Sequence, residues 1–221
     1  MTDIVSNVKW SNNVILVDAD YVDKVAFNLI VNFERMLERR IPQADFARWI
    51  DCVALDGGIR PASDTDNPSV QETQVILVHS KDSRQMDNFK PGNYAEELHG
   101  KAFKDHLGEF IINAYPIEEI AGGENYFTDV LELVANEKDV KRIMLIPDAE
   151  NANIYNKVRE TLRKVKDDEK RITLFAMQPM AGGNYRQEIL GYSLMAALGI
   201  SSEELNNKYK ANGWHLQVLQ V

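Results

Sequence analysis

Cysteine is nearly absent from this chain, which has a single one, Cys52, among its 221 residues. One cysteine can form no disulfide within the chain and cannot supply the thiolates of a structural metal cluster. Its position in the apolar run WIDCVAL indicates a small buried side chain. Histidine is scarce as well, and the four copies show none of the i, i+4 spacing of a helical zinc site. The sequence therefore does not predict a zinc site.

Long hydrophobic runs are missing. No stretch approaches the roughly 20 apolar residues that a membrane span needs. The first ten residues, MTDIVSNVKW, also lack the basic segment followed by an apolar run that is typical of a secretion signal. We therefore expect no membrane association and no secretion, and we expect a cytoplasmic location.

Positive charge is in deficit, because 25 Lys and Arg stand against 34 Asp and Glu and give a net charge of −9. Affinity for a phosphate backbone comes mainly from Lys and Arg side chains that release counterions. A general nucleic-acid-binding surface is therefore not expected. Any contact with RNA would have to be made at a local site.

The chain does contain enough apolar side chains for a substantial core, since hydrophobic residues make up 44% and charged residues 27% of it. We expect a single domain over residues 1–221, with a core at about 13–178 and a C-terminal helical extension and tail at 184–221. The tail WHLQVLQV alternates apolar and polar residues, which predicts an edge strand or a homo-oligomer contact.

Short apolar runs alternate along the chain with longer segments of helical periodicity. This succession predicts an α/β fold, a three-layer sandwich with a mostly parallel central sheet. Residues 80–101 are polar and irregular, and Ser201 or Ser202 with Glu204 resembles a capping box that opens a last helix. The predicted strands are 14–17, 49–55, 75–78, 110–114, 143–146 and 172–175, and the predicted helices are 21–40, 126–134, 149–165 and 186–198.

Acidic residues follow the predicted strands. In open α/β sheets ligands bind beyond the carboxyl ends of the strands, so these positions are candidate site residues. Crowded carboxylates repel one another, and a Mg²⁺ or Mn²⁺ ion is the usual way to stabilise such a group. The pattern predicts a metal-dependent phosphoryl-transfer site. The acids are Asp18 and Asp20 after 14–17, Asp56 after 49–55, Asp82 after 75–78, Asp148 and Glu150 after 143–146, and Asp129 on the helix before that strand.

Each of these acids has an alternative interpretation as a helix cap or a turn residue, because Asp is favoured where a strand leads into a helix. Asp148 could simply cap the helix that follows it, and Asp56 precedes the turn-forming pair Gly57-Gly58. The repeated D-x-D/E form at two strand ends, DAD at 18–20 and DAE at 148–150, favours a site. A cap needs only one acid, so the second acid of each pair remains to be explained.

The stretch VILVDADYV resembles the opening strand of NYN-type PIN-like nucleases, which have an apolar run, then Asp, any residue, and Asp or Asn. In that family a helix carrying an Asp precedes a strand that ends in a Ser-Gly-Asp-x-Asp-Phe-like motif, and FTDVLELVANEKDVKRIMLIPDAEN has the same layout. Asp129 matches the helical acid, Asp148 the first acid of the motif and Glu150 the second. The resemblance extends loosely over residues 14–175 and implies a PIN-like, NYN-type fold and a magnesium- or manganese-dependent endoribonuclease.

The sequence departs from that family inside the motif itself. Ile146 and Pro147 stand where Ser and Gly are expected, and Asn151 stands where Phe is common. Loss of the Ser removes a hydroxyl group that could contact the metal or a phosphate. These differences are typical of a distant relative.

Two hypotheses follow for the function. In the first, the protein is a metal-dependent phosphodiesterase acting on RNA, in which Asp18, Asp129 and Asp148 are catalytic and bind the cation, and Asp20 and Glu150 complete its shell. In the second, it is an inactive relative, a non-catalytic binding or assembly module that keeps the fold and uses its acids as helix caps.

Overall fold

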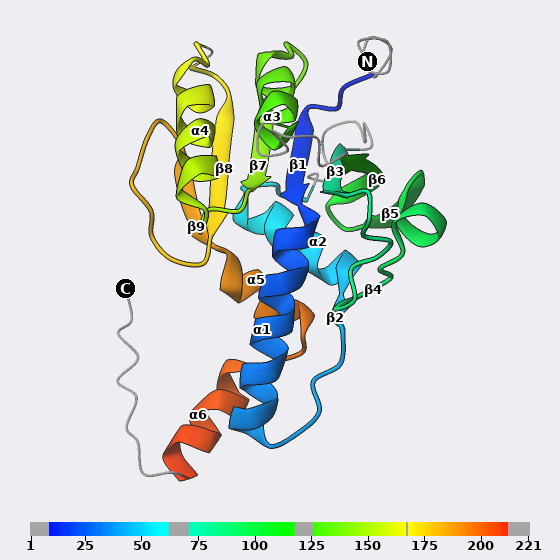
Figure 1. Cartoon of the computed structure of the whole chain (residues 1–221), viewed down its shortest axis with the longest axis vertical. Coiled ribbons are helices and arrows are strands. Elements are labelled where there is room, and N and C mark those ends of the chain that lie inside the picture. The colour runs from blue at the N-terminus through cyan, green and yellow to red at the C-terminus, as the bar shows by residue number, and fades with distance from the viewer. Residues whose placement is uncertain (1–8, 62–70, 118–125, 167, 212–221) are drawn as a thin grey trace.

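A seven-stranded sheet forms the centre of the molecule in the computed structural model, which describes residues 9–61, 71–117, 126–166 and 168–211 (Figure 1). The strand order is β5-β6-β3-β1-β7-β8-β9, and all neighbours are parallel except β5 and β6. The predicted α/β fold with a mostly parallel sheet is therefore confirmed. The strands are β1 (Asn13–Asp18), β3 (Glu72–Ser80), β5 (Lys101–Asp105), β6 (Gly108–Ile117), β7 (Arg142–Ile146), β8 (Arg171–Ala176) and β9 (Arg186–Ile189), while β2 (Ala44–Asp45) and β4 (Phe89–Lys90) form a separate short pair.

Helices pack on both faces of this sheet. One face is covered by α1 (Ala19–Leu37), α2 (Phe46–Asp56) and α5 (Leu190–Ala197), and the other by α3 (Tyr126–Asn136) and α4 (Ala152–Arg163). The last helix, α6 (Ser202–Ala211), lies beside the far end of α1 (Figure 1), and a π-helical turn, η1 (Tyr94–Leu98), precedes β5. Among the described helices, none has the length and apolar character required to cross a membrane.

The central strand β1 shows why a continuous apolar run forms a buried strand. Its side chains alternate, so that Val14 and Leu16 join the core beneath α3 and α4, and Ile15 and Val17 join the core beneath α1, α2 and α5. All four are fully buried. A parallel strand covered on both faces needs no polar positions until it leaves the sheet, and full burial of each such side chain contributes about 1.5–3 kcal/mol.

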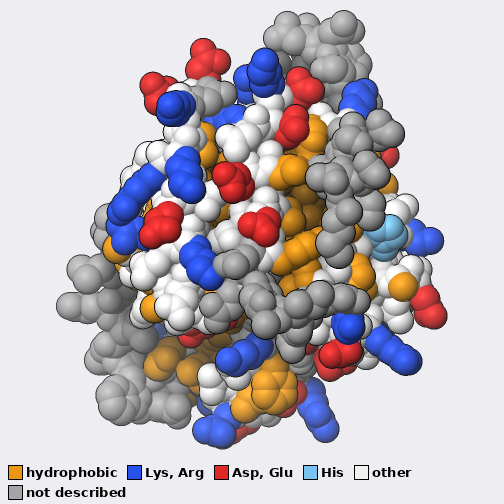
Figure 2. Space-filling view, turned by 45° about the horizontal axis from the view of Figure 1, so that its top comes forward, with side chains coloured by type: hydrophobic (Ala, Val, Ile, Leu, Met, Phe, Trp, Pro, Cys, Tyr) orange, Lys and Arg blue, Asp and Glu red, His pale blue; other side chains and the backbone are white. Residues whose placement is uncertain are grey.

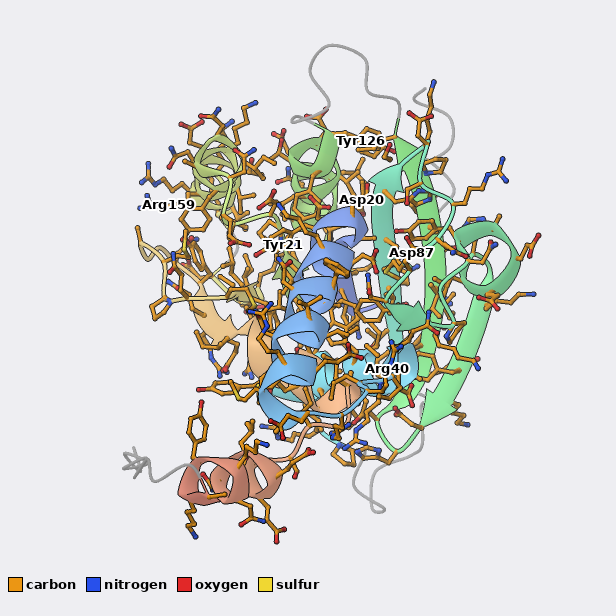
Figure 3. All side chains as sticks on the ribbon, turned by 60° about the horizontal axis from the view of Figure 1, so that its bottom comes forward. Asp20, Tyr21, Arg40, Asp87, Tyr126 and Arg159 are labelled. Carbon is orange, nitrogen blue, oxygen red and sulfur yellow. The ribbon has the colours of Figure 1, made fainter. Side chains whose placement is uncertain are left out.

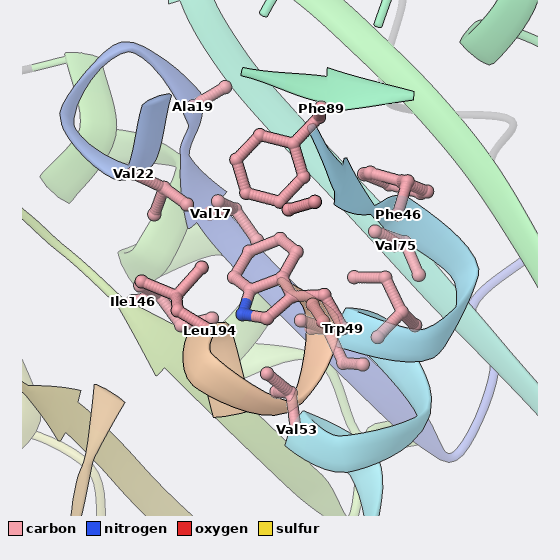
Figure 4. Close-up of a cluster of buried hydrophobic side chains, with 14 of the residues drawn as sticks. Val17, Ala19, Val22, Phe46, Trp49, Val53, Val75, Phe89, Ile146 and Leu194 are labelled. Carbon is pink, nitrogen blue, oxygen red and sulfur yellow. The ribbon is translucent and has the colours of Figure 1, made fainter. Parts of the chain in front are cut away.

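Residues 49–55, predicted as a strand, instead belong to helix α2, and that prediction was wrong. The Asp45 carboxylate caps the helix by accepting a hydrogen bond from the Arg48 N–H at 3.1 Å. The apolar residues then fall on one helical face, and Trp49 at its centre packs between Phe46 and Phe89 (Figure 4). The Trp49 Nε1–H donates to the Ser193 Oγ at 3.2 Å, which ties α2 to α5.

The predicted helix over 186–198 was wrong in its first four residues, which form β9, the outermost strand beside β8. The helix predicted over 149–165 begins later, at Ala152, because the Asn151 side chain caps it. β5 was not predicted at all. The helix predicted over 21–40 ends earlier, at Leu37. The other predicted strands and helices are confirmed within a few residues at their ends, as is the cap of α6, where Ser201 Oγ accepts from the Glu204 N–H at 3.1 Å. The C-terminal tail, predicted as an edge strand or oligomer contact, lies outside the described residues.

Candidate functional site: an acidic cluster at the carboxyl ends of β1 and β7

The strand order places the ends of β1 and β7 side by side. The chain passes from β1 to β3 to β6 in one direction across the sheet, then returns to β7 on the other side of β1 and continues to β8 and β9. Val17 pairs with Ile146 at the end of this strand pair. The loops that follow β1 and β7 therefore diverge at the point where the direction of winding reverses, which is where open α/β sheets bind ligands.

Asp18 is the last residue of β1 and the N-cap of α1, where its Oδ1 accepts a hydrogen bond from the Tyr21 N–H at 3.1 Å. Burial raises the pKa of this carboxyl group to about 7. The Tyr21 N–H lowers the pKa, whereas the charges of Asp20 and Asp148 raise it further. None of the described charges that act on Asp18 is positive. The ionised carboxylate is therefore poorly compensated, and a cation or a proton would stabilise it.

Asp20 lies in the first turn of α1 and connects this helix to β3. Its Oδ2 accepts a hydrogen bond from the Ser80 N–H at 2.6 Å. Figure 3 shows Asp20 and Tyr21 on different sides of the first turn of α1, with Asp20 on the side of β3. This second acid of the DAD sequence has a structural partner of its own, and its negative charge still acts on Asp18.

Asp148 and Glu150 are brought to the same place by the loop between β7 and α4. The Asp148 Oδ1 accepts from the backbone N–H groups of Glu150 and Asn151, both at 3.2 Å, so this acid closes the loop. The helix itself is capped by Asn151, and the predicted role of Asp148 as the α4 N-cap is not what the structure shows. Glu150 is exposed, and its carboxylate faces the Tyr21 hydroxyl. We call Asp18, Asp20, Asp148 and Glu150 the acidic cluster.

The hydroxyl groups of Tyr21 and Tyr94 are buried beside the acidic cluster and form no well-aligned hydrogen bond among the described residues, although Glu150 interacts with the first and Ser83 with the second. The side chains are 6% and 3% exposed. Burial raises the pKa of both phenols well above the usual value, and so do nearby carboxylates, chiefly Glu150 for Tyr21 and Asp20 for Tyr94. A buried hydroxyl without a partner costs about 1–3 kcal/mol, so a water, ion or ligand oxygen is expected to complete this region.

Tyr94 is held in place by the end of β3. Its ring stacks on the ring of the buried His79, with centroids 3.7 Å apart and 6° between the ring planes. Tyr94 lies in η1, a segment that the sequence suggests only as irregular and polar. Neither tyrosine was among the predicted site residues. Tyr21 could have been suspected because it follows the DAD sequence directly, but nothing local to Tyr94 connects it with Asp18.

The other predicted acids have different surroundings, although the Asp82 N–H donates to the Oγ of Ser80, the residue whose own N–H binds Asp20. Asp129 is exposed on the first turn of α3 and is not one of the charges that act on Asp18. Asp56 ends helix α2 and not a strand, and its pKa is raised by burial and by Glu188 on β9. Asp82 is exposed in the turn after β3. Asp18, Asp20, Asp148 and Glu150 thus act on one another or on Tyr21, and a role of Asp129 in the metal shell stays a prediction.

The acidic cluster is suited to oxygen-preferring cations because it offers only oxygen donors. Within the described part of the chain, no three of its carboxylates present oxygen atoms that all lie within 4.8 Å of one another. Mg²⁺ usually keeps several waters and binds through one or two carboxylates, so it does not need three converging acids. The residues present therefore fit Mg²⁺ or Mn²⁺ better than a metal that requires a full protein shell.

Comparison with known proteins identifies a family but no activity. The model of DUF6621, a family of unknown function, matches residues 7–205. The chain belongs to the DUF6621 family. No curated protein and no solved structure matches it. The match extends over β1, β7 and the loops that carry the acidic cluster, so the cluster lies inside the family region.

Proposed function

We propose that the acidic cluster binds Mg²⁺ or Mn²⁺ and hydrolyses phosphodiester bonds, with RNA as the expected substrate. The observation that carries this proposal is Asp18, a carboxylate that is nearly buried, flanked by the charges of Asp20 and Asp148, and located at the switch point of a parallel sheet. Keeping several carboxylates ionised at such a place requires a cation.

The residues of the acidic cluster take different roles in this proposal. Asp18 and Asp148 hold the ion, and each is oriented by backbone N–H groups. Asp20 and Glu150 orient the outer ligand shell of the ion, and Asp20 is held in place by the Ser80 N–H. A bound divalent ion supplies Lewis acidity at the scissile phosphate and favours hydrolysis by water. The Tyr21 hydroxyl, which forms no well-aligned hydrogen bond among the described residues, is available to a phosphate or water oxygen.

The resemblance to NYN-type PIN-like nucleases supports the proposed substrate class, because that family also uses acids that follow its first strand and a later strand. In this chain Asp18 ends β1 and Asp148 follows the adjacent strand β7. Basic and acidic side chains are interspersed on the face shown in Figure 2, with no continuous basic surface among the described residues in view. This supports a local contact with RNA rather than a broad one.

A second candidate function is a non-catalytic binding or assembly module. It is favoured by the hydrogen bonds of the acids, because Asp18 caps α1 and Asp148 closes the loop before α4. Ile146 and Pro147, in place of the Ser and Gly of the nuclease motif, also favour it. The two functions differ in what happens when a cation is added, since caps alone do not bind one.

The test is the substitution Asp148→Asn, measured by thermal unfolding with and without millimolar Mg²⁺ or Mn²⁺. Binding to the folded state alone adds RT ln(1 + [L]/Kd), about 2.7 kcal/mol at one hundred times Kd. The parent should therefore melt at a higher temperature with metal. Asp148→Asn keeps an oxygen for the Glu150 and Asn151 N–H groups but removes a charge near Asp18. The metal-free variant should melt higher than the parent, and its gain from metal should shrink.

Cleavage of single-stranded RNA with Mn²⁺ should fall at least about tenfold in Asp148→Asn, because groups that merely support metal ligands already contribute 10–100-fold. Asp45→Asn is the matched control, since Asp45 is an exposed helix cap that does not belong to the acidic cluster. It should leave metal response and cleavage unchanged. If neither metal stabilises the parent, or if Asp148→Asn equals the parent in every measurement, the module function stands instead.

A further inference from the structure

A second group of potential metal ligands lies at the opposite edge of the sheet. Asp51 is on α2, Asp105 is the last residue of β5, and His106 is in the turn between β5 and β6. Because β6 runs parallel to β3 and begins at Gly108, this turn is at the amino edge of the sheet, whereas the acidic cluster is at the carboxyl edge. Two elements far apart in the sequence meet here, and neither was assigned a role in the acidic cluster.

The three side chains converge closely. One ligand atom from each lies within 4.8 Å of the other two, and the His106 Nδ1 is 3.7 Å from the Asp51 Oδ1. No other group of three His, Cys, Asp or Glu residues in the described part of the chain is this compact. Such a separation is too long for a hydrogen bond and suits atoms that share one ion, since two ligands of a tetrahedral metal with bonds of about 2.0–2.2 Å lie roughly 3.3–3.6 Å apart.

The turn that carries two of the ligands is fixed by its backbone. The Asp105 Oδ1 accepts from the Leu107 N–H at 2.7 Å, and the Glu109 N–H donates to the backbone carbonyl oxygen of Gln71 at 2.8 Å. Gly108 has a φ of 117°, and a Cβ there would approach the Gln71 oxygen to 2.0 Å, so only glycine fits. Asp105 and His106 are therefore held in position before any ion binds.

The charges of this group are poorly balanced. The Asp51 and Asp105 carboxylates lie side by side, and His106 is the one basic side chain of the group. The Asp51 Oδ1 atom is buried and has no hydrogen-bond donor among the described residues. Two carboxylates in contact, with one buried oxygen lacking a donor, require either a shared proton or a cation between them.

We propose that Asp51, Asp105 and His106 form a binding site for a divalent ion of the zinc class, which joins α2 to the β5–β6 turn. The imidazole nitrogen decides the metal class, because imidazole suits Zn²⁺ and related ions, whereas Mg²⁺ takes oxygen ligands. Three protein ligands are the number found in open zinc sites, where a water fills the fourth position. His106 is 58% exposed, which gives an ion a route from solvent. The sequence argument against zinc concerned only thiolate clusters and helical His pairs, and this site is neither.

The test is calorimetric titration of the metal-stripped full chain with Zn²⁺, together with NMR of the imidazole groups. We expect one tight site per chain and a shift of the His106 resonances. Asp51→Asn and His106→Gln should each weaken Zn²⁺ binding at least about tenfold, given that even supporting groups contribute that much. His106 is mostly exposed and Asp51→Asn removes a repulsion, so both variants should fold.

Asp148→Asn separates this proposal from the proposed function, because it alters the acidic cluster and leaves Asp51, Asp105 and His106 unchanged. Zn²⁺ binding should be unaffected in Asp148→Asn, and the response to Mg²⁺ should be unaffected in His106→Gln. Zn²⁺ binding that is absent from the parent, that survives His106→Gln and Asp51→Asn, or that is lost in Asp148→Asn would overturn the assignment. A parent that binds Zn²⁺ as expected but shows no Mg²⁺ or Mn²⁺ response would overturn only the nuclease proposal.

Discussion

The two groups of carboxylates at opposite edges of the sheet differ in what the backbone gives them. At the carboxyl edge, Asp18, Asp20 and Asp148 each accept at least one backbone N–H, two of these N–H groups being at the start of helix α1 or the end of β3. At the amino edge, Asp51 lies within a helix whose own N–H groups are already used, and its buried Oδ1 finds no donor among the described residues. Strand ends that lead into helices supply positive partial charge, and the middle of a helix supplies none.

The two groups of carboxylates also differ in how strongly water screens their charges. The Asp18 carboxyl is nearly buried, so its pKa is the more strongly raised of the two, whereas the half-buried Asp51 is screened by water. A hydrogen bond alone therefore does not stabilise a buried carboxylate in its ionised form. Asp18 keeps its backbone partner and is still costly to ionise, because burial and neighbouring charge outweigh one N–H.

The largest expected effect is on the pH dependence of stability. A pKa of about 7 in the folded protein against 3.8 in the unfolded chain means that between these values the folded state holds a proton that the unfolded state has lost. The free energy of unfolding of the metal-free protein should therefore fall as pH rises from about 4 to about 7, by up to roughly 4 kcal/mol from this group. Asp18→Asn should flatten this dependence and be more stable than the parent at pH 8, as measured by urea unfolding.

Asp45→Asn provides the matched control for Asp18→Asn. Asp45 caps α2 with a hydrogen bond of the same length, 3.1 Å, but is exposed. Asn and Asp are similar caps, so this substitution should change the free energy of unfolding by less than about 0.5 kcal/mol at either pH. A parent whose stability does not decrease from pH 5 to pH 8, or an Asp18→Asn variant with the same slope as the parent, would show that Asp18 is ionised without penalty.

A smaller effect is expected from Tyr21→Phe. The Tyr21 hydroxyl forms no well-aligned hydrogen bond among the described residues, so its removal should leave the metal-free protein unchanged or up to about 1 kcal/mol more stable in urea unfolding. Tyr155→Phe is the control, because the Tyr155 hydroxyl contacts the Ala181 oxygen and the Tyr185 hydroxyl. That variant should lose about 1 kcal/mol. Equal losses in the two variants would mean that Tyr21 has a partner in the free protein and is not available to a ligand.

The smallest effect is expected from Asp129→Asn, which tests how far the nuclease resemblance extends. Asp129 is exposed on α3 and does not act on Asp18, so the substitution should change the free energy of unfolding by less than about 0.5 kcal/mol. It should also leave the rise of melting temperature with Mn²⁺ unchanged. A metal response reduced as much as in Asp148→Asn would instead place Asp129 in the metal shell, as the resemblance implies.

The strands at the centre of the sheet, and the acids that follow them, could be predicted from the residues alone. Val14–Val17 and Ile143–Ile146 are apolar at every position, because a strand covered on both faces has no solvent side, and this property is local. An acid placed directly after such a run must emerge at the carboxyl edge, so Asp18 and Asp148 could be assigned to one edge without coordinates. The residues of β1 and β7 do not show that these two strands are neighbours, because their pairing depends on the order in which all strands join the sheet.

Only the tertiary structure decided whether the apolar run at 49–55 is strand or helix, because short runs fit both periods and here the Asp45 cap and the packing of Trp49 against α5 fix the helix. That choice has a consequence for the chemistry. In α2 the apolar residues face the sheet, and Asp51 is turned toward the β5–β6 turn, where it meets Asp105 and His106. Contacts between side chains so far apart in the chain arise from the packing of whole elements, which residue spacing does not encode.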